Sequence, residues 1–512
     1  MIQSAIRSFF FTFCLSFLGL SPAAADELTL GSPFTDHMVL QRDQPVPVWG
    51  RAEPGASVKV SFAGQNKETT VTESGNWRVS LDPLTGTAEG DRLTVRAGGA
   101  GDEGSEIALT DVVVGEVWIC SGQSNMQMGR NSVPELQALS ESNLRSFEVK
   151  RTVAFEEQER CEGKWEVAGP NSAVAFGFAH HLEKHADVPV GIILACWGSS
   201  SIEAWMPRDM TEQFPHFKTI MEEWDANTEA QEQIKAALAK EKWSGPEDVF
   251  MRRQSCIIYN AMIKPIAPFS CRGLVWYQGE RNTRYISGMP DEPWFHRVAG
   301  VREYDDVLKG WMQRYRKEWG RDDFHFLMVM LPGYGSILKS GPTMEPNHPT
   351  SHSWAWFRES QLAALELPHS GVANTIDLGD FKNIHPKDKA PIGERLALLA
   401  ARDTLSKEVE ASGPILKRVQ SKGDRLVVHF EHGHGLKTSD GEAPREFWIS
   451  DESGKDWKPA AAEIVGETVE LHSPDVAKPV QVRYAFTGKP DVNLQNSANL
   501  PAYPFRTDQN EP

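Results

Sequence analysis

The sequence has few of the residues and patterns that mark several large functional classes. It contains six cysteines in 512 residues, and their spacings match no zinc site. It has no His-Glu-x-x-His motif, no phosphate-binding Gly-x4-Gly-Lys loop and no glycine-rich dinucleotide fingerprint after a strand. We therefore expect neither a metal ion nor another cofactor, which argues against zinc hydrolases, P-loop enzymes and NAD-dependent dehydrogenases.

Positive charge is also scarce in this chain. Lys and Arg number 53 against 70 Asp and Glu, which gives a formal net charge of −17. Such a surface repels nucleic acids and anionic membranes, so we expect neither as a partner. The balance says little about a small substrate, because a local basic pocket can exist on an acidic protein.

Long apolar runs are absent beyond the N-terminus, so no membrane-spanning helix is expected there. At the N-terminus, Arg7 precedes an apolar stretch that ends at Leu20, and an Ala-x-Ala pattern ends at Ala25. This arrangement is typical of a secretory signal peptide over residues 1–25. We therefore expect an exported protein, periplasmic or extracellular.

Removal of the signal peptide would take Cys14 with it and leave an odd number of cysteines. At least one cysteine of the exported chain would then be a free thiol. Cys120 and Cys196 lie in apolar, strand-like runs and are expected to be buried small side chains. A disulfide among the other three is left open: Cys161, Cys256 and Cys271.

The pattern of apolar residues changes twice along the chain and predicts three folded units. Residues 26–110 contain short alternating strands between Gly and Pro turns, typical of a small β-sandwich. Residues 111–408 alternate apolar runs with amphipathic stretches, which predicts a doubly wound α/β unit with a parallel sheet. Residues 409–512 return to short strands and predict a second β module. The runs behind these predictions are strands at 112–120, 188–196, 274–276, 326–331 and 372–376, helices at 173–185, 304–318 and 391–405, and C-terminal strands at 426–430, 447–449, 464–471 and 482–486, with insertions at 211–242 and 283–302.

The strongest chemical signal follows the first strand of the central unit. An apolar run from Val112 to Cys120 breaks abruptly into Ser121-Gly122-Gln123-Ser124-Asn125. A buried strand that ends in Gly and small polar residues forms a turn that can aim N–H groups and a hydroxyl at a ligand. Ligands of open α/β sheets bind at that edge. Ser124 therefore lies where a nucleophile would be useful, although Ser at such a turn also often caps a helix.

Two further motifs, taken together with the Ser124 turn, narrow the function. The chain contains GQSNM at 122–126, WYQGERN at 276–282 and NIHPKDK at 383–389, the last followed by GERLA at 393–397. Together they resemble the sialate O-acetylesterase family of SGNH-type carbohydrate esterases, and the likeness extends to segments 39–60 and 499–508. It implies a flavodoxin-like hydrolase domain flanked by β-sandwich-like modules.

The resemblance implies a serine esterase that removes O-acetyl groups from a sugar or glycan, most directly from sialate at the 9-position. An acetylated xylan or pectin is the main alternative substrate. A carbohydrate-binding protein with an idle site is the alternative from another class. The oligomeric state is left open by the sequence.

Ester hydrolysis needs a nucleophile, a base and donors for the oxyanion. The resemblance implies Ser124 as the nucleophile, with Ser121 as a rival by proximity, and His385 as the base. The group that orients His385 is less clear, because Asn383 stands where family members often have Asp. We favour Asp380 for this role, and the alternatives are Asp377, Asn383 or a backbone group.

Oxyanion donors are expected from three loops. They are the N–H of Ser124, the N–H of Gly198 in CWGSSSIEAW, where the missing Cβ permits close approach, and the amide of Gln278. Asn282 is the alternative to Gln278. Arg281 stands where the family usually has Ser and could bind a substrate carboxylate, although a solvated arginine is the more common case. The substrate-contacting candidates are Gln123, Asn125, Trp205, Glu280, Arg281 and Asn282, with Trp276, Tyr277 and Trp294 as further aromatic candidates and a structural carboxylate as the alternative for Glu280.

Overall fold

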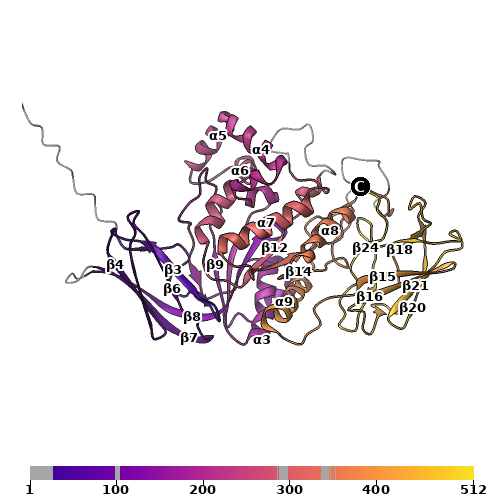
Figure 1. Cartoon of the computed structure of the whole chain (residues 1–512), viewed down its shortest axis with the longest axis horizontal. Coiled ribbons are helices and arrows are strands. Elements are labelled where there is room, and N and C mark those ends of the chain that lie inside the picture. Colours follow the sequence, from indigo (N-terminus) through magenta and orange to yellow (C-terminus); the bar gives the residue numbers. More distant parts are fainter. Residues whose placement is uncertain are drawn as a thin grey trace, which may run out of the picture.

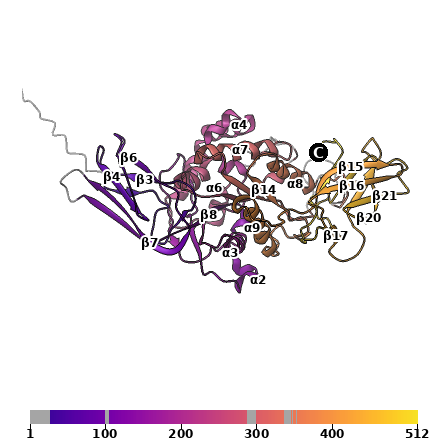
Figure 2. The same cartoon turned by 60° about the horizontal axis from the view of Figure 1, so that its bottom comes forward.

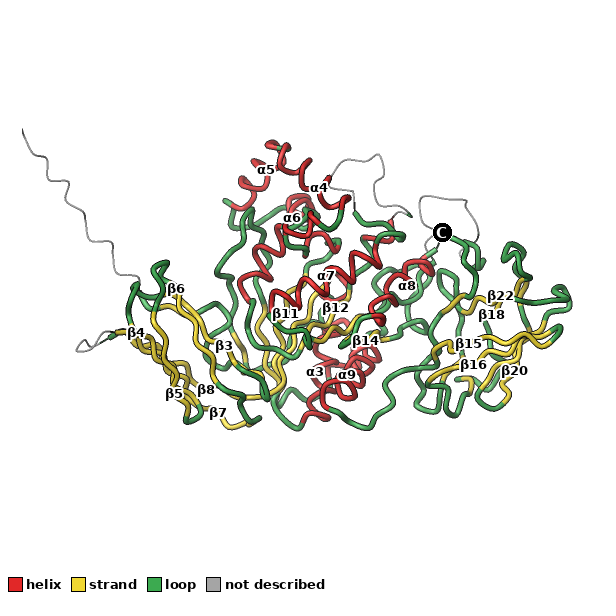
Figure 3. The backbone as a smooth tube through the Cα atoms, viewed as in Figure 1, coloured by secondary structure: helices red, strands yellow, loops and turns green. Residues whose placement is uncertain are grey.

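A computed structural model describes residues 27–98, 104–284, 286, 298–335, 345, 347–351 and 353–512. Three parts stand in a row: N-terminal strands, a body of helices and strands, and a second group of strands (Figures 1 and 2). The helices gather in the middle part (Figure 3). The predicted combination of helices and strands, an α/β class, is thus confirmed. The predicted signal peptide lies outside the described residues, as does Trp294.

The N-terminal strands form two small antiparallel arrangements. Strands β1, β3 and β6 make one sheet, and β4 pairs with β5 and β7 in the other. The alternation seen in the sequence orients β4, since Val58 and Val60 are 0% exposed while Ser57 and Lys59 face solvent. The bounds are β1 Thr29–Leu30, β2 Val39–Gln41, β3 Val46–Arg51, β4 Ser57–Phe62, β5 Gln65–Thr70, β6 Asn76–Leu81 and β7 Thr87–Gly98.

Strand β8, Ser105–Gly122, belongs to both the N-terminal part and the body. Its first half pairs with β7 in antiparallel and with β2 in parallel orientation. From Glu116 onward it pairs in parallel with β11 on one side, and from Trp118 with β12 on the other. The strand therefore crosses position 110, where the sequence pattern placed a domain border.

The central sheet follows a doubly wound order. Counted along the chain from β8, the strands β11-β8-β12-β13-β14 stand in the order 2-1-3-4-5, all parallel. Strand β9 pairs with β11 in parallel, and β10 pairs with β9 in antiparallel orientation. The sheet is therefore mixed, whereas a wholly parallel sheet was predicted. The bounds are β9 Leu144–Glu148, β10 Trp165–Glu166, β11 Val190–Cys196, β12 Gly273–Tyr277, β13 His325–Val329 and β14 Ser370–Ala373.

Helices cover both faces of this sheet. Helices α3 and α9 pack together on one face, and α7 and α8 lie on the other (Figure 1). The α3–α9 crossing is close, because a Cβ on Gly393 would lie 2.5 Å from the carbonyl carbon of Gly177. The charged insertion predicted at 211–242 is helical, as α4 and α5. The bounds are α1 Ser124–Gln127, α2 Pro134–Gln137, α3 Ala173–Ala186, α4 Pro215–Ala226, α5 Thr228–Leu238, α6 Gly245–Met251, α7 Tyr304–Trp319, α8 Trp354–Leu362 and α9 Ala390–Leu405.

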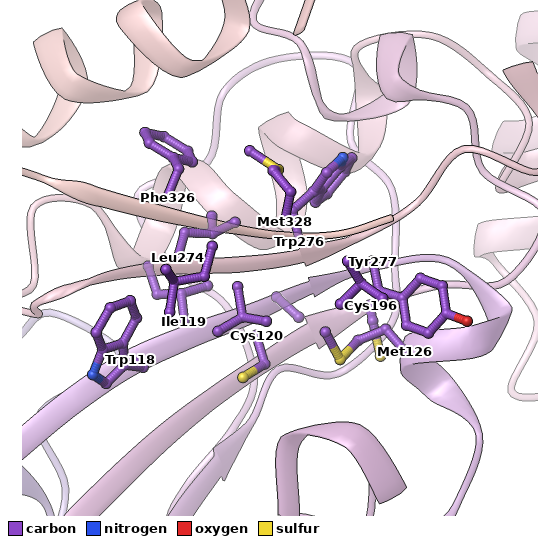
Figure 4. Packing of buried hydrophobic residues seen from close by; sticks show 14 of the residues in the cluster. Trp118, Ile119, Cys120, Met126, Cys196, Leu274, Trp276, Tyr277, Phe326 and Met328 are labelled. Carbon is purple, nitrogen blue, oxygen red and sulfur yellow. The ribbon is translucent and has the colours of Figure 1, made fainter. Parts of the chain in front are cut away.

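The core of the body surrounds the central strands. Side chains of β8, β12 and β13 pack on both sides of the sheet, and Met126 of α1 lies beside Tyr277 and Cys196 at the strand ends (Figure 4). Cys120 and Cys196 are buried, as predicted. All five cysteines of the described part are free, so the disulfide left open among the other three is not formed there.

The C-terminal part is a second set of antiparallel strands. The segment 464–471, expected as one strand, is instead a hairpin of β20 and β21, because Gly466 takes a positive φ of 64° and reverses the chain. Arg358 of α8 joins this part to the body, since its guanidinium donates to the carbonyls of Leu331 (2.9 Å) and Thr487 (2.9 Å). No helix in the described ranges is long and apolar enough to cross a membrane. The bounds are β15 Ile415–Lys422, β16 Arg425–Glu431, β17 Lys437–Thr438, β18 Phe447–Ser450, β19 Lys458–Pro459, β20 Ala461–Val465, β21 Thr468–His472, β22 Gln481–Tyr484, β23 Leu494–Gln495 and β24 Phe505–Arg506.

Candidate active site

The turn after β8 places Ser124 at the carboxyl edge of the sheet. Gly122 has φ of 137°, and a Cβ there would lie 2.1 Å from the carbonyl oxygen of Tyr277, so only glycine fits. The N–H of Gln123 donates to that same oxygen (3.0 Å), and the N–H of Trp197 donates to the carbonyl of Gly122 (3.0 Å). The ends of β8, β11 and β12 are thereby tied together directly below Ser124.

Ser124 pairs with a histidine that lies 261 residues later in the chain. Its Oγ lies 2.8 Å from Nε2 of His385. The hydroxyl does not cap α1, because the N-cap residue is Gln123 and no side-chain cap bond is formed. The rival Ser121 is 1% exposed, and its buried hydroxyl has no hydrogen-bond partner in the described part of the chain. Of the two serines, Ser124 is the one in reach of a base.

The electrostatic setting of His385 suits a proton acceptor. Partial burial of the ring lowers its pKa, and the positive charge of Lys389 lowers the pKa further. A lowered pKa leaves the imidazole neutral at neutral pH, which is the form that can take a proton from a hydroxyl.

The loop that carries His385 is held by its own polar side chains. Asp380 Oδ1 accepts hydrogen bonds from the N–H groups of Lys382 and Asn383, each at 2.7 Å, and these bonds lower its pKa. Asn383 accepts from the N–H of His385 (3.0 Å) and donates to its carbonyl (2.8 Å). Among the described residues no hydrogen bond joins Asp380 to the imidazole, so its role as the orienting carboxylate stays a prediction. The alternative, Asp377, forms a bidentate ion pair with Arg395 of α9, both bonds at 2.7 Å.

Gly198 lies against Ser124 on the side of β11. A Cβ on Gly198 would be 3.2 Å from the Cβ of Ser124. The N–H of Gly198 donates to Oε1 of Gln127 at 2.7 Å. The N–H expected to stabilise an oxyanion is therefore close to Ser124, but it already donates its hydrogen bond to the side chain of Gln127. Gln127 was not identified from the sequence, although it lies one helical turn after Ser124.

Gln278 and Asn282 form a buried amide network beneath the site. Both are 0% exposed. Gln278 Nε2 donates to Asn282 Oδ1 (2.8 Å) and to the carbonyl of Ser200 (3.2 Å), while its Oε1 accepts from the hydroxyl of Tyr304 (2.8 Å). Asn282 also accepts from the N–H of Ile202 (3.2 Å). A role for either amide as an oxyanion donor would require this network to rearrange.

Gln123 belongs to the same network. It is 3% exposed, and its Oε1 accepts from the N–H of Arg281 (3.2 Å) and from Nε2 of Gln278 (3.3 Å). The network therefore fixes the Ser124 turn to the loop after β12. Arg281 itself is half-buried in that loop.

Asn125 and Glu280, both predicted to contact substrate, meet at a buried junction behind the Ser124–His385 pair. Asn125 Nδ2 donates to Glu280 Oε1, and Lys389 Nζ donates to Asn125 Oδ1 at 2.8 Å. The three residues are at most 8% exposed. Lys389 stands in the quoted NIHPKDK motif, and its charge next to the histidine was a signal that the sequence analysis did not use.

The aromatic candidates are packing residues in this structure, which corrects the expectation for Trp205. Its ring is 0% exposed, its Nε1 donates to Ser200 Oγ (2.9 Å), and it packs edge-to-face on Trp276. Trp276 is 1% and Tyr277 0% exposed. None of the three presents a face on which a sugar could stack, because each closes the core under a strand end.

The chain resembles known esterases along nearly all its length. Residues 114–244 match the family model described as "Carbohydrate esterase, sialic acid-specific acetylesterase". The mouse sialate O-acetylesterase is 28% identical over 540 residues, with 95% of each chain covered. The human sialate O-acetylesterase is 26% identical over 520 residues, covering 93% of this chain and 91% of the human one.

A solved structure supports the same relation. A carbohydrate acetylesterase from Xanthomonas citri superposes with a TM-score of 0.75 at 32% identity, covering 94% of this chain and 99% of that protein. The similarity therefore includes both flanking groups of strands as well as the body.

Proposed function

The chain belongs to the sialate O-acetylesterase family of carbohydrate esterases. From this premise we propose how its site catalyses the reaction and which substrate it acts on. It is a carboxylic ester hydrolase that removes O-acetyl groups from carbohydrate. The observation that carries the mechanism is the 2.8 Å contact between Ser124 Oγ and His385 Nε2 beside the backbone of Gly198.

The first half of the reaction transfers the acetyl group to the protein. His385 Nε2 takes the proton of Ser124 Oγ as the oxygen attacks the acetyl carbonyl carbon. The negative charge that develops on the carbonyl oxygen is stabilised by the N–H groups of Ser124 and Gly198. The sugar hydroxyl then leaves with the proton from His385. In the second half, water loses a proton to His385 and attacks the carbonyl carbon of acetyl-Ser124. The bond to Ser124 Oγ then breaks, His385 returns the proton to Oγ, and acetic acid leaves and ionises to acetate.

Substrate binding must displace a contact that the free protein makes. The N–H of Gly198 is bonded to Gln127 Oε1 at 2.7 Å, and an acyl oxygen can accept from it only where that bond is given up. We propose that the Gln127 side chain turns away as the acetyl group enters. Its amide is half-buried and stands on the last residue of α1, so it can rotate without unfolding the helix.

We also propose that the body is a flavodoxin-like SGNH hydrolase domain flanked by two β-sandwich-like modules. The parallel strand order 2-1-3-4-5 supports this, together with the serine and glycine after the first two strands of that set. Asn282, after the third, lies in the amide network and holds the neighbouring loops.

Acetylated sialic acid is the substrate we favour, because the similar mammalian proteins are sialate O-acetylesterases. Acetate release from 9-O-acetylated sialic acid, acetylxylan and acetylated pectin, measured side by side, tests this choice. Fastest release from the sialic acid is the expected result. The Ser124→Ala variant in the same series should release none, and full activity in that variant would remove the nucleophile assignment.

Export stays a proposal. A signal peptide over residues 1–25 would give a periplasmic or extracellular enzyme, and N-terminal sequencing of the protein from cell fractions tests it. The alternative of an idle carbohydrate-binding protein is set aside, because the similar proteins indicate a carboxylic ester hydrolase.

A further inference from the structure

A buried cation lies behind the catalytic pair and has no part in the mechanism above. Lys389 is 0% exposed and stands at the N-cap position of α9, four residues after His385. Its Nζ lies 5.4 Å from the centre of the Tyr277 ring. A buried ammonium is costly unless it is paired, and a cation at a helix N-terminus opposes the helix dipole. Fold stability alone would be served better by an uncharged side chain here.

One carboxamide connects this cation to both members of the catalytic pair. Asn125 accepts from Lys389 Nζ (2.8 Å) and donates to the carbonyl of Ile384 (3.0 Å). In the sequence, Asn125 directly follows Ser124 and Ile384 directly precedes His385. A shift of the Asn125 side chain would therefore be passed to the backbone on both sides of the 2.8 Å Ser124–His385 contact.

Glu280 supplies the opposite charge at the far side of Asn125. Its Oε1 accepts from Asn125 Nδ2, and its Oε2 is buried with no hydrogen-bond partner in the described ranges. Burial raises the pKa of Glu280 to about 6, and burial lowers the pKa of Lys389 to about 8 against the opposing charges of Glu280 and Asp388. Both groups are thus ionised near neutral pH. The described residues include no direct ion pair between them, so Asn125 is the bridge.

We propose that Lys389 is a positioning residue for the Ser124–His385 pair, holding it through Asn125 and acting on the imidazole through its charge. This inference rests on the serine-esterase function proposed above. Lys389 touches neither the reacting hydroxyl nor the imidazole, so its influence passes through other groups.

Among the charged side chains around His385, Lys389 is the one whose charge shifts the pKa of the imidazole. Helix α1 carries no charged side chain. Of all the charges on the histidine loop and after β12, the ammonium of Lys389 is the one that lowers the pKa of His385. The charged side chains compared are Asp377, Asp380, Lys382, Lys387, Asp388 and Lys389 on the histidine loop, and Glu280 and Arg281 after β12.

The test compares Lys389→Met with Lys387→Met in the full chain. Lys387 is exposed, two residues earlier in the same loop, and serves as the matched control. For each variant, kcat and KM for p-nitrophenyl acetate are measured across pH, and thermal unfolding checks that the protein is folded.

For Lys389→Met we expect kcat to fall roughly 10- to 100-fold with little change in KM, because small misplacements of reacting groups cost about that much. The acidic limb of the pH profile should move to higher pH, since the ammonium no longer lowers the pKa of His385. Lys387→Met should match wild type in both. Wild-type kcat in Lys389→Met would overturn the proposal. So would a lower kcat with an unmoved acidic limb, because that is the mark of a purely structural role.

A second variant keeps the idea testable where Lys389→Met does not fold. Glu280→Gln keeps an acceptor for Asn125 and removes the charge that raises the pKa of Lys389. The ammonium should then be lost at lower pH, so the alkaline decline of kcat should begin earlier than in wild type. An alkaline limb that stays in place would overturn the proposal. Ser124→Ala separates the two hypotheses: if it is inactive while both variants behave as wild type, only the role of Lys389 fails.

Discussion

Asp380→Asn decides between two roles for the carboxylate that holds the histidine loop. In the structure Asp380 Oδ1 accepts two backbone N–H groups at 2.7 Å each, from Lys382 and Asn383. Asparagine keeps an Oδ1 that can accept both. The side chain is exposed, so the lost charge is screened by solvent. If this geometry holds in the working enzyme, kcat should fall by less than about tenfold.

The alternative predicts a far larger effect. A carboxylate that orients a catalytic imidazole costs roughly 10⁴-fold in kcat when it becomes an amide. The two roles therefore differ by about three powers of ten, well beyond the error of a p-nitrophenyl acetate assay. Asp380→Ala, which removes both acceptors, should be worse than Asp380→Asn, because the loop that holds His385 loses its anchor. A loss of a thousandfold or more in Asp380→Asn would refute this reasoning and make Asp380 the third catalytic residue.

Four further predictions follow from the site and its supports. The value of kcat/KM should fall as the pH drops through the pKa of His385. The midpoint should lie below the ordinary histidine value of about 6.5, because burial and Lys389 lower that pKa. A midpoint above 7 in the pH profile would contradict this. Acetyl esters should be turned over faster than butyryl or octanoyl esters, and the reverse order in a chain-length series would point to a lipolytic enzyme. Gln127→Ala should keep or raise activity toward p-nitrophenyl acetate, because it frees the N–H of Gly198; a large loss would mean that Gln127 binds substrate. Gly393→Ala should destabilise the protein by about 1–3 kcal/mol through overpacking against Gly177, measured by thermal unfolding with Gly245→Ala, where a Cβ meets nothing within 4 Å, as the control.

The elements with a strong local pattern could be predicted from the sequence. The apolar runs that became β8, β11 and β12 are buried along their whole central length. A short continuous apolar run bounded by turn residues is typical of such strands. Strand β9 was missed because it is part polar. Arg145 within it is 8% exposed and donates to the carboxylate of Asp111 (3.0 Å) and the carbonyl of His37 (2.9 Å), partners far away in the sequence.

The site shows the same division between local pattern and long-range contact. Ser124 and His385 could be named because each stands in a recognisable motif. The burial of Trp205 and the bridge from Lys389 to Asn125 could not be named, since they depend on side chains that meet only when three loops close on one another. Likewise Gln278 reads as an available amide in the sequence, yet its bonds are taken up by Asn282, Ser200 and Tyr304.

The shared strand β8 has a consequence for how this enzyme can be cut, fused or inherited. Its 18 residues span about 60 Å at the usual rise of a strand, with Ser124 just past one end and the N-terminal sheet at the other. A shortened protein starting at position 111 would expose Val112 to Val114, whose partners on β7 and β2 would be gone. Such a bare apolar edge invites pairing with other chains and aggregation. The smallest unit that can be exchanged between proteins therefore includes the N-terminal strands. We expect the esterase body to fold, and to be inherited, only together with them.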